Sequence, residues 1–279
     1  SYLMSSASAP TGNNFSDNDL NIRMEPSAPL EKGKPVTVRM TITHKDTGAP
    51  VTPEELKVVH TEKIQLFVVD KGLRDYQHIH PQPTDKPGVY EYSFTPKTQL
   101  NYNAWADIVL AGDDVQHRIK TQMAGQTERG SAALIVPSSN VMHDGINCNW
   151  SAHPPLQKGG SSMVQIMLRD ADGKPVTDLE PIMGAYIHLV GFTPDGKTMI
   201  HTHPVEEEPA TPNERGGPSF NFHIEPEVSG AVQFYVQVQR NGLESYIPVG
   251  QMIKPPALQT ARYMAAQQSA NLGTGYLGL

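Results

Sequence analysis

The sequence has a single cysteine, Cys148, among its 279 residues. One cysteine excludes both an intrachain disulfide and a cysteine-rich zinc module. Long apolar runs are also missing, because no stretch reaches the roughly 18 residues needed to span a bilayer. Basic residues are few: 22 Lys and Arg stand against 29 Asp and Glu, which gives a net charge of −7. Without a basic cluster, we expect no binding to nucleic acid or to an anionic membrane surface.

Catalytic signatures are equally scarce. The sequence contains no G-x-S-x-G, no H-E-x-x-H and no phosphate-binding glycine loop, so we expect a protein that is not an enzyme. The chain starts at Ser1 without an initiator methionine, as a mature exported protein does after signal removal, although a trimmed chain would start in the same way. We expect a secreted, periplasmic or cell-surface location.

Turn-forming residues are abundant, with 24 Pro and 23 Gly, and many short segments are rich in β-branched residues. No long amphipathic helical pattern competes with them. This combination is typical of short strands joined by turns, and it predicts an all-β protein.

The chain contains an internal duplication. Four segments recur in the same order: Pro29–Thr52 with Pro155–Thr177, Ile64–Pro81 with Ile187–Pro204, Gly88–Pro96 with Pro218–Pro226, and Tyr102–Ile108 with Val232–Val238. Such self-similarity indicates two copies of one domain. We define repeat 1 as residues 19–123 and repeat 2 as residues 144–254, joined by a small, polar linker at 124–143. About seven short alternating runs in roughly 100 residues predict an immunoglobulin-like Greek-key β-sandwich for each repeat.

The two tails, residues 1–18 and 255–279, cannot build a core. One interpretation is disorder. The other is that Tyr2, Leu3, Tyr276 and Leu277 dock onto a neighbouring subunit and make a homo-oligomer or filament.

A His-x-His-Pro motif occurs once in each repeat, in "DYQHIHP" and in "MIHTHP". A hairpin turning at Asp195-Gly196 places His203 opposite His188, with His201 on the same strand face. The equivalent hairpin in repeat 1 turns at Gly72-Leu73 and places His80 opposite Gln65, while His78 keeps its place. We expect His60 to supply the missing imidazole there. Asp107 and its counterpart Gln237 are expected nearby on a later strand.

Three neutral imidazoles suit zinc, copper or nickel, and Met183 or Met199 nearby would favour copper(I). We therefore predict a copper site in each repeat, with zinc as the alternative ion, and the more complete site in repeat 2. The competing interpretation is that the histidines only brace the fold, since a duplication copies position and spacing together.

Other candidates are weaker. Cys148 and His153 have the spacing of a blue-copper ligand loop, but no methionine follows at the required distance, so Cys148 is predicted to be a buried apolar residue. His223 alternates out of phase with its apolar neighbours and is predicted to face solvent. The remaining histidines lie in predicted turns or linkers without a partner at ligand spacing: His44, His117, His143 and His153.

The segments "HTEKIQLFVVDKGLRDYQHIHP" and "PIMGAYIHLVGFTPDGKTMIHTHP" resemble the secreted, YtkA-like group of bacterial proteins. The resemblance spans about residues 19–254. It implies exported tandem immunoglobulin-like sandwiches with no established catalytic activity and a suspected role in copper handling. The positions it carries over are His60, His78, His80, His188, His201 and His203. Gln65 departs from a usual histidine, and Met183-Gly184 departs from a usual Leu-Gly.

The sequence thus leads to one main hypothesis and one alternative. The main hypothesis is an exported, non-enzymatic protein that binds copper for sequestration or delivery. The alternative is a structural or adhesive surface protein, such as a polymer subunit assembled through its tails, in which the histidines are structural.

Overall fold

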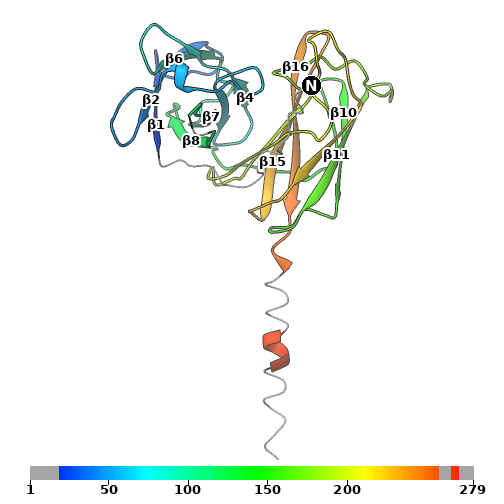
Figure 1. The fold of residues 1–279 in the computed structure, drawn as a ribbon. Helices are drawn as coiled ribbons and strands as arrows, with labels where there is room; N and C mark the ends of the chain where they lie inside the picture. The colour runs from blue at the N-terminus through cyan, green and yellow to red at the C-terminus, as the bar shows by residue number, and fades with distance from the viewer. Residues whose placement is uncertain (1–18, 113, 258–264, 270–279) are drawn as a thin grey trace, which may run out of the picture.

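The computed structural model describes residues 19–112, 114–257 and 265–269. The predictions for Tyr2, Leu3, Tyr276 and Leu277 fall outside these residues. Within them, the chain forms four antiparallel sheets of four strands each, two per repeat (Figure 1). No helix in these ranges has the length and apolar character needed to cross a membrane.

The sheets of repeat 1 have the strand orders β1-β2-β6-β5 and β4-β3-β7-β8. The bounds are β1 Leu20–Pro26, β2 Val36–His44, β3 Gln65–Asp70, β4 Tyr76–Ile79, β5 Gln82–Pro83, β6 Val89–Phe94, β7 Tyr102–Val109 and β8 Gln116–Met123, with a 3₁₀ turn at Pro53–Glu55. These orders correspond to the A-B-E-D and C′-C-F-G sheets of an immunoglobulin-like sandwich.

Repeat 2 has the strand orders β14-β11-β10-β9 and β13-β12-β15-β16. The bounds are β9 Asn140–His143, β10 Ile146–His153, β11 Ser162–Asp170, β12 His188–Phe192, β13 Met199–Thr202, β14 Ser219–Ile224, β15 Gly230–Arg240 and β16 Leu243–Ile253. The second sheet repeats the C′-C-F-G order, so the predicted tandem β-sandwich is confirmed. Strand β9, which pairs with β10, lies inside the segment 124–143 that we predicted to be a linker.

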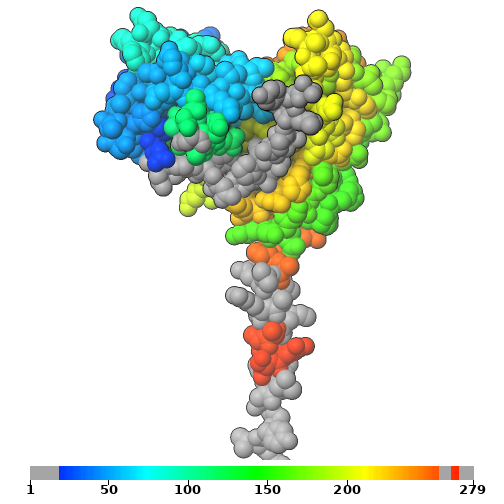
Figure 2. Space-filling view, in the orientation of Figure 1, coloured from blue at the N-terminus to red at the C-terminus, as the bar shows by residue number. Residues whose placement is uncertain are grey.

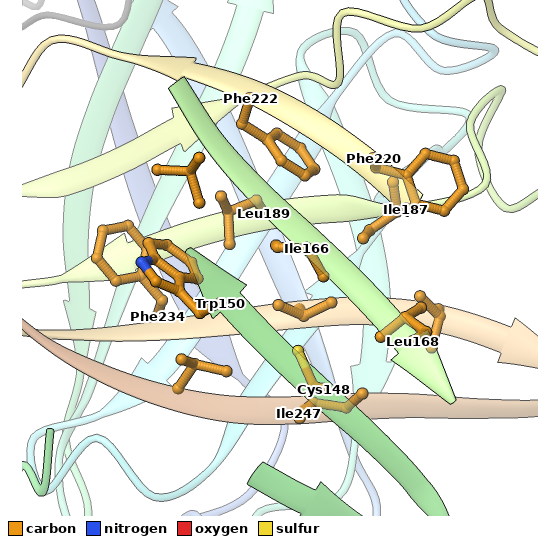
Figure 3. Close-up of a cluster of buried hydrophobic side chains, with 14 of the residues drawn as sticks. Cys148, Trp150, Ile166, Leu168, Ile187, Leu189, Phe220, Phe222, Phe234 and Ile247 are labelled. Carbon is orange, nitrogen blue, oxygen red and sulfur yellow. The ribbon is translucent and has the colours of Figure 1, made fainter. Parts of the chain in front are cut away.

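Each sandwich has its own apolar core, formed because alternate residues of its strands point inward. In repeat 2 the Trp150 and Phe234 rings pack with centroids 4.8 Å apart, and Cys148 lies in the same cluster (Figure 3). The Cys148 side chain is fully buried, as predicted, and burial raises the pKa of its thiol to about 12. A thiol that stays protonated in an apolar core is a packing group rather than a nucleophile.

Both predicted hairpin registers are confirmed. In repeat 1, Leu66 pairs with Ile79, and in repeat 2, Leu189 pairs with Thr202. These registers place His80 opposite Gln65 and His203 opposite His188, each one residue beyond the paired ladder.

A third apolar core lies between the two repeats. Strands β3 and β12 are buried at every position, because one face of each packs on its own sandwich and the other face packs on the other repeat. The buried members of this interdomain core are Phe67, Val69, Leu73, Tyr76, Trp105, Val190, Phe192, Met199 and Tyr235. Figure 2 shows the two repeats as adjoining lobes, with repeat 1 running from blue through cyan into green and repeat 2 from green through yellow to orange.

The interdomain core has an approximate two-fold symmetry. Phe67, Val69 and Tyr76 of repeat 1 align in sequence with Val190, Phe192 and Met199 of repeat 2, and Trp105 aligns with Tyr235. The same surface patch of each repeat therefore contacts its counterpart, as in a symmetric homodimer. The Tyr235 hydroxyl also donates a hydrogen bond of 2.6 Å to the Leu73 carbonyl across the interface.

Truncation of Phe192 tests whether this core holds the repeats together. Its ring is fully buried, with its centroid 5.4 Å from that of Trp105 and 5.5 Å from that of Tyr76. We expect Phe192→Ala to lower the free energy of unfolding by about 3–5 kcal/mol and to split urea unfolding into two transitions. The control is Phe222→Ala, which truncates a ring in the core of repeat 2. It should lower the stability of repeat 2 without increasing the separation of the two repeats measured by X-ray scattering. A loss below about 1 kcal/mol for Phe192→Ala would contradict the interdomain core.

Candidate functional site

All six predicted histidines lie where the two repeats meet. His78 on β4 is paired with Phe67 of β3, so both side chains point to the interdomain face. The Phe67 ring stacks on His78 with centroids 4.6 Å apart and touches His201 of repeat 2 at 4.7 Å. The histidines therefore border the interdomain core instead of facing solvent.

The six imidazoles form two groups of three. We define the His78 trio as His78, His80 and His188, with ring centroids 5.1 Å apart for His78–His80 and 5.5 Å for His78–His188. We define the His203 trio as His60, His201 and His203, with centroids 4.3 Å apart for His60–His203 and 4.6 Å for His201–His203.

This grouping corrects the predicted one. We expected His60 to join His78 and His80, and His188 to join His201 and His203, within each repeat. Instead, each His-x-His pair takes its third ring from the other repeat. The strand registers were right, but the face that carries the histidines is covered by the partner repeat, so the nearest third ring lies across the interface.

A tight two-residue turn carries His60 across the interface. His60 and Thr61 have positive φ angles of 49° and 71°, and the aligned residues Met183 and Gly184 of repeat 2 have φ angles of 51° and 78°. Two successive positive φ angles are typical of a type I′ turn. A Cβ atom placed on Gly184 would lie 3.7 Å from the His60 Cα, so the tips of the two turns touch.

Two hydrogen bonds cross the interface at equivalent positions. His201 Nδ1 lies 3.2 Å from Asp107 Oδ2, and His78 Nδ1 lies 2.9 Å from Gln237 Oε1. Asp107 and Gln237 are aligned positions on β7 and β15, and sequence reasoning placed them near the histidines without assigning the bonds. Each residue binds a histidine of the other repeat.

The tautomers of two rings follow from their partners. His188 Nε2 lies 2.6 Å from the Ile182 carbonyl, and His201 Nδ1 faces the Asp107 carboxylate. Neither partner can donate, so these ring nitrogens carry the protons and donate. The second nitrogen of each ring is left with a lone pair.

Four imidazole nitrogens of the two trios are buried without a hydrogen-bond partner. They are His78 Nε2, His80 Nε2, His188 Nδ1 and His201 Nε2. A buried polar atom left unsatisfied costs about 1–3 kcal/mol, and such atoms are few in native proteins. All three rings of the His78 trio contribute one, whereas the His203 trio contributes only that of His201.

Burial keeps the imidazoles neutral. It lowers the pKa of His188 to about 4, and it lowers the pKa values of His78, His201 and His203, with neighbouring histidines adding to the effect. Burial also lowers the pKa of His80, although the nearby Glu62 carboxylate opposes the shift. At neutral pH these rings therefore carry no charge and offer lone pairs.

Asp107 stays ionised beside the His203 trio. Burial alone would raise the pKa of its carboxyl group, but the Arg118 guanidinium and the His201 hydrogen bond hold this pKa well below its usual value. Arg118 donates from Nε at 2.7 Å and from Nη2 at 2.8 Å to the two Asp107 oxygens. A third bond, from Arg118 Nη1 to the Met199 carbonyl at 3.1 Å, reaches repeat 2. Sequence reasoning missed Arg118, although the register of the β7–β8 hairpin pairs it with Asp107.

A small pocket of about 30 Å³ adjoins the His203 trio. Its lining includes all three rings of that trio together with Gln65 and Asp107. This volume is large enough to hold a water molecule or an ion. Within the described ranges, no group of three or more His, Cys, Asp or Glu side chains has the spacing to hold a metal ion as the side chains stand.

The remaining histidines lie outside the two trios. His44, His117 and His143 lie in β2, β8 and β9, and His153 ends β10, so the prediction that they lie in turns or linkers was wrong. The prediction that His223 points away from the core is confirmed by the alternation of β14.

A protein-family model matches residues 15–125 and again residues 139–253, which together make up most of the chain. Its description is "Domain of unknown function (DUF8832)". The chain belongs to this family. The two matches confirm that it carries two copies of one domain, here two copies of DUF8832. No curated protein sequence matches the chain.

Several solved structures are similar at low identity. MtrC from Shewanella baltica is 8% identical with a TM-score of 0.25, and the match covers 84% of this chain and 68% of MtrC. A DUF4785 family protein from Legionella pneumophila is 14% identical with a TM-score of 0.27, covering 85% of this chain and 58% of that one. The α2-macroglobulin of Escherichia coli is 12% identical with a TM-score of 0.23, covering 86% of this chain but only 16% of its own.

The lowered pKa values predict a specific pH dependence of stability. Between about pH 4 and the ordinary histidine value of 6.5, the unfolded chain binds a proton at His188 that the folded chain does not. Stability is therefore fully present above pH 6.5 and falls as the pH is lowered, by up to about 1.4 kcal/mol per pH unit for each such histidine. Urea unfolding at pH 7.5, 6.0 and 5.0 measures this slope.

The variant His188→Gln should have a shallower slope than the native chain, because its side chain does not titrate. The control is His143→Gln, which removes a half-exposed histidine of β9 outside the interdomain face. A native stability that is flat between pH 7.5 and 5.0 would be incompatible with neutral, buried imidazoles.

Proposed function

We propose that this DUF8832 protein is an exported, non-enzymatic protein that binds copper through its interdomain histidines, with zinc as the alternative ion. The observation that carries the proposal is that the two nitrogens of a buried ring have different surroundings. One nitrogen of His78, His188 and His201 is bonded to an oxygen acceptor, and the other is buried and bare.

Histidines that bind metals show this arrangement. A ligating imidazole usually donates its second N–H to a carboxylate, a carbonyl or water, which fixes the tautomer and orients the ring toward the ion. Asp107, Gln237 and the Ile182 carbonyl supply such acceptors here. An ion would also satisfy the nitrogens whose burial otherwise destabilises the fold.

The His78 trio fits an ion better than the His203 trio. Metal–nitrogen bonds of about 2.0–2.1 Å in tetrahedral geometry place two ligating imidazole centroids about 5 Å apart. The His78–His80 and His78–His188 separations of 5.1 and 5.5 Å agree with that value, and all three rings have a bare nitrogen. The sequence favoured repeat 2, whereas this observation favours a site that takes two ligands from repeat 1 and one from repeat 2.

The protonation state supports the same function. Imidazoles must be neutral to bind a metal, and protons compete with the ion when the pKa is high. Burial has already lowered the pKa values of the rings in the His78 trio. Three nitrogen ligands leave a coordination position open, which suits uptake and release, and hence sequestration or delivery. The resemblance to the YtkA-like proteins supports export.

Metal titration of the full chain tests the proposal. We expect the native protein to bind copper, with a rise in unfolding temperature, and His78→Gln/His80→Gln/His188→Gln to lose at least tenfold in affinity. The variant Gln237→Ala leaves all ligands in place but removes the acceptor of His78, so it should weaken binding about 10–100-fold.

The control is His143→Gln, which should bind like the native chain. His60→Gln/His201→Gln/His203→Gln reports on the other trio. The proposal fails if the native chain binds neither copper nor zinc more tightly than His78→Gln/His80→Gln/His188→Gln does. The histidines would then be structural. Circular dichroism of each variant separates a lost site from a lost fold.

A further inference from the structure

A chain of hydrogen bonds runs from the surface of repeat 2 to the buried His78 ring of repeat 1. Gln237 on β15 joins the two ends: its Nε2 atom lies 2.7 Å from Glu244 Oε1, and its Oε1 atom lies 2.9 Å from His78 Nδ1. Glu244 on β16 is exposed, whereas Gln237 and His78 are buried. We define Glu244, Gln237 and His78 as the Glu244 relay.

The carboxylate decides which way the Gln237 amide points. An ionised carboxylate only accepts hydrogen bonds, so the Gln237 atom that faces Glu244 must be the NH₂ donor. The reversed amide would bring two oxygen acceptors together. With its nitrogen turned to Glu244, Gln237 presents its oxygen to His78.

This orientation fixes the tautomer of His78. The Gln237 oxygen cannot donate, so His78 Nδ1 carries the proton and donates to it. The other ring nitrogen, Nε2, then keeps a lone pair, and it is buried without a partner. The tautomer of His78 is thus set by the opposite repeat, whereas that of His188 is set by the Ile182 carbonyl of its own repeat.

The strand that carries Glu244 also holds the His78 backbone. Tyr246 lies two residues after Glu244 on β16 and directly opposite Gln237 on β15, so the three side chains share one face of the sheet. The Tyr246 hydroxyl accepts a hydrogen bond of 3.2 Å from the His78 backbone N–H. This face of repeat 2 therefore binds both the ring and the backbone of His78.

The other trio places its carboxylate differently. Asp107 contacts its histidine directly, is held by the Arg118 guanidinium, and is paired with Arg118 in the β7–β8 register. The aligned pair in repeat 2 is Gln237 and Tyr246, and Tyr246 supplies no positive charge. A neutral amide occupies the buried position there, and the carboxylate of Glu244 stays in solvent, where its charge costs little desolvation.

We propose that Glu244 is a positioning residue of the copper site, which holds His78 in the tautomer with a bare Nε2 by orienting the Gln237 amide. The role of His78 as a ligand rests on the proposed function. Outer partners of a ligating histidine fix its tautomer and ring orientation. Here a glutamine carries that influence from a carboxylate of one repeat to a ligand of the other.

Nitrogen NMR of the metal-free chain tests the tautomer. Long-range ¹H–¹⁵N correlations distinguish protonated from bare ring nitrogens, and His78→Gln identifies the signals of His78. We expect Nδ1 to be protonated and Nε2 bare in the native chain. Glu244→Gln keeps the shape but can donate as well as accept, so it should release the amide and populate the second tautomer. The control Glu62→Gln removes a carboxylate 3.8 Å from His80 Nδ1 and should leave the His78 signals unchanged.

Copper titration tests the consequence for the site. We expect Glu244→Gln to weaken copper binding by about tenfold, the lower end of the range for a lost outer partner. In the Gln237→Ala background it should have no further effect, because Glu244 acts through Gln237.

Two results would overturn the relay: an equal loss of affinity in both backgrounds, which would indicate a direct effect of charge, or the same His78 tautomer in the native and Glu244→Gln chains. A native chain that binds no copper would overturn the proposed function and the ligand role of His78. The metal-free spectra would still decide whether Glu244 sets the tautomer.

Discussion

The structure depends on the burial of one extra sheet face in each repeat. An isolated immunoglobulin-like sandwich buries one face of each sheet and leaves the other to water. Here the outward faces of β3–β4–β7 and β12–β13–β15 carry Phe67, Trp105, Phe192 and Tyr235, and they exclude water by packing on one another. That packing buries His78, His188 and His201 and partly buries the other three histidines of the trios. It lowers the pKa values of five of the six and lets Asp107 and Gln237 bond to rings of the opposite repeat.

The polar groups of the interface reduce the stability that its apolar groups provide. Aromatic burial stabilises the docked repeats, but every imidazole buried beside it must replace its hydrogen bonds to water. The structure replaces about half of these hydrogen bonds. In His78 and in His188, one ring nitrogen has an acceptor and the other has no partner. A low-dielectric surrounding makes an unpaired nitrogen costly. Under the proposed function, a bound ion would remove this cost by pairing with those nitrogens.

Much of this could be predicted from the sequence, because it depends on local pattern. The duplication, the sandwich class, the hairpin registers and the burial of Cys148 all follow from periodicity and turn chemistry, and all were confirmed. The composition of each trio could not be predicted, because it depends on which surface of one folded repeat fits the other. The continuous apolar run "QLFVVD" of β3 indicated burial on both faces, but no local feature identifies the covering partner. Arg118 was missed for a related reason: it binds Asp107 within repeat 1, yet its bond to the Met199 carbonyl exists only after docking.

The approximate symmetry of the interface explains why the two trios differ. Exchanging the repeats maps His78, His80 and His188 onto His201, His203 and Gln65, so the second site has a glutamine where the first has a histidine. Gln65 does line the pocket beside His201 and His203, and its Oε1 atom is buried without a partner. The turn of repeat 1 brings His60 to this incomplete trio, at a position where repeat 2 has Met183. The loss of one imidazole in β3 is thus matched by the gain of another in the adjoining turn, and the ionised Asp107 stands beside it in place of the neutral Gln237. Divergence after duplication has left two histidine trios of equal number but with different charges beside them.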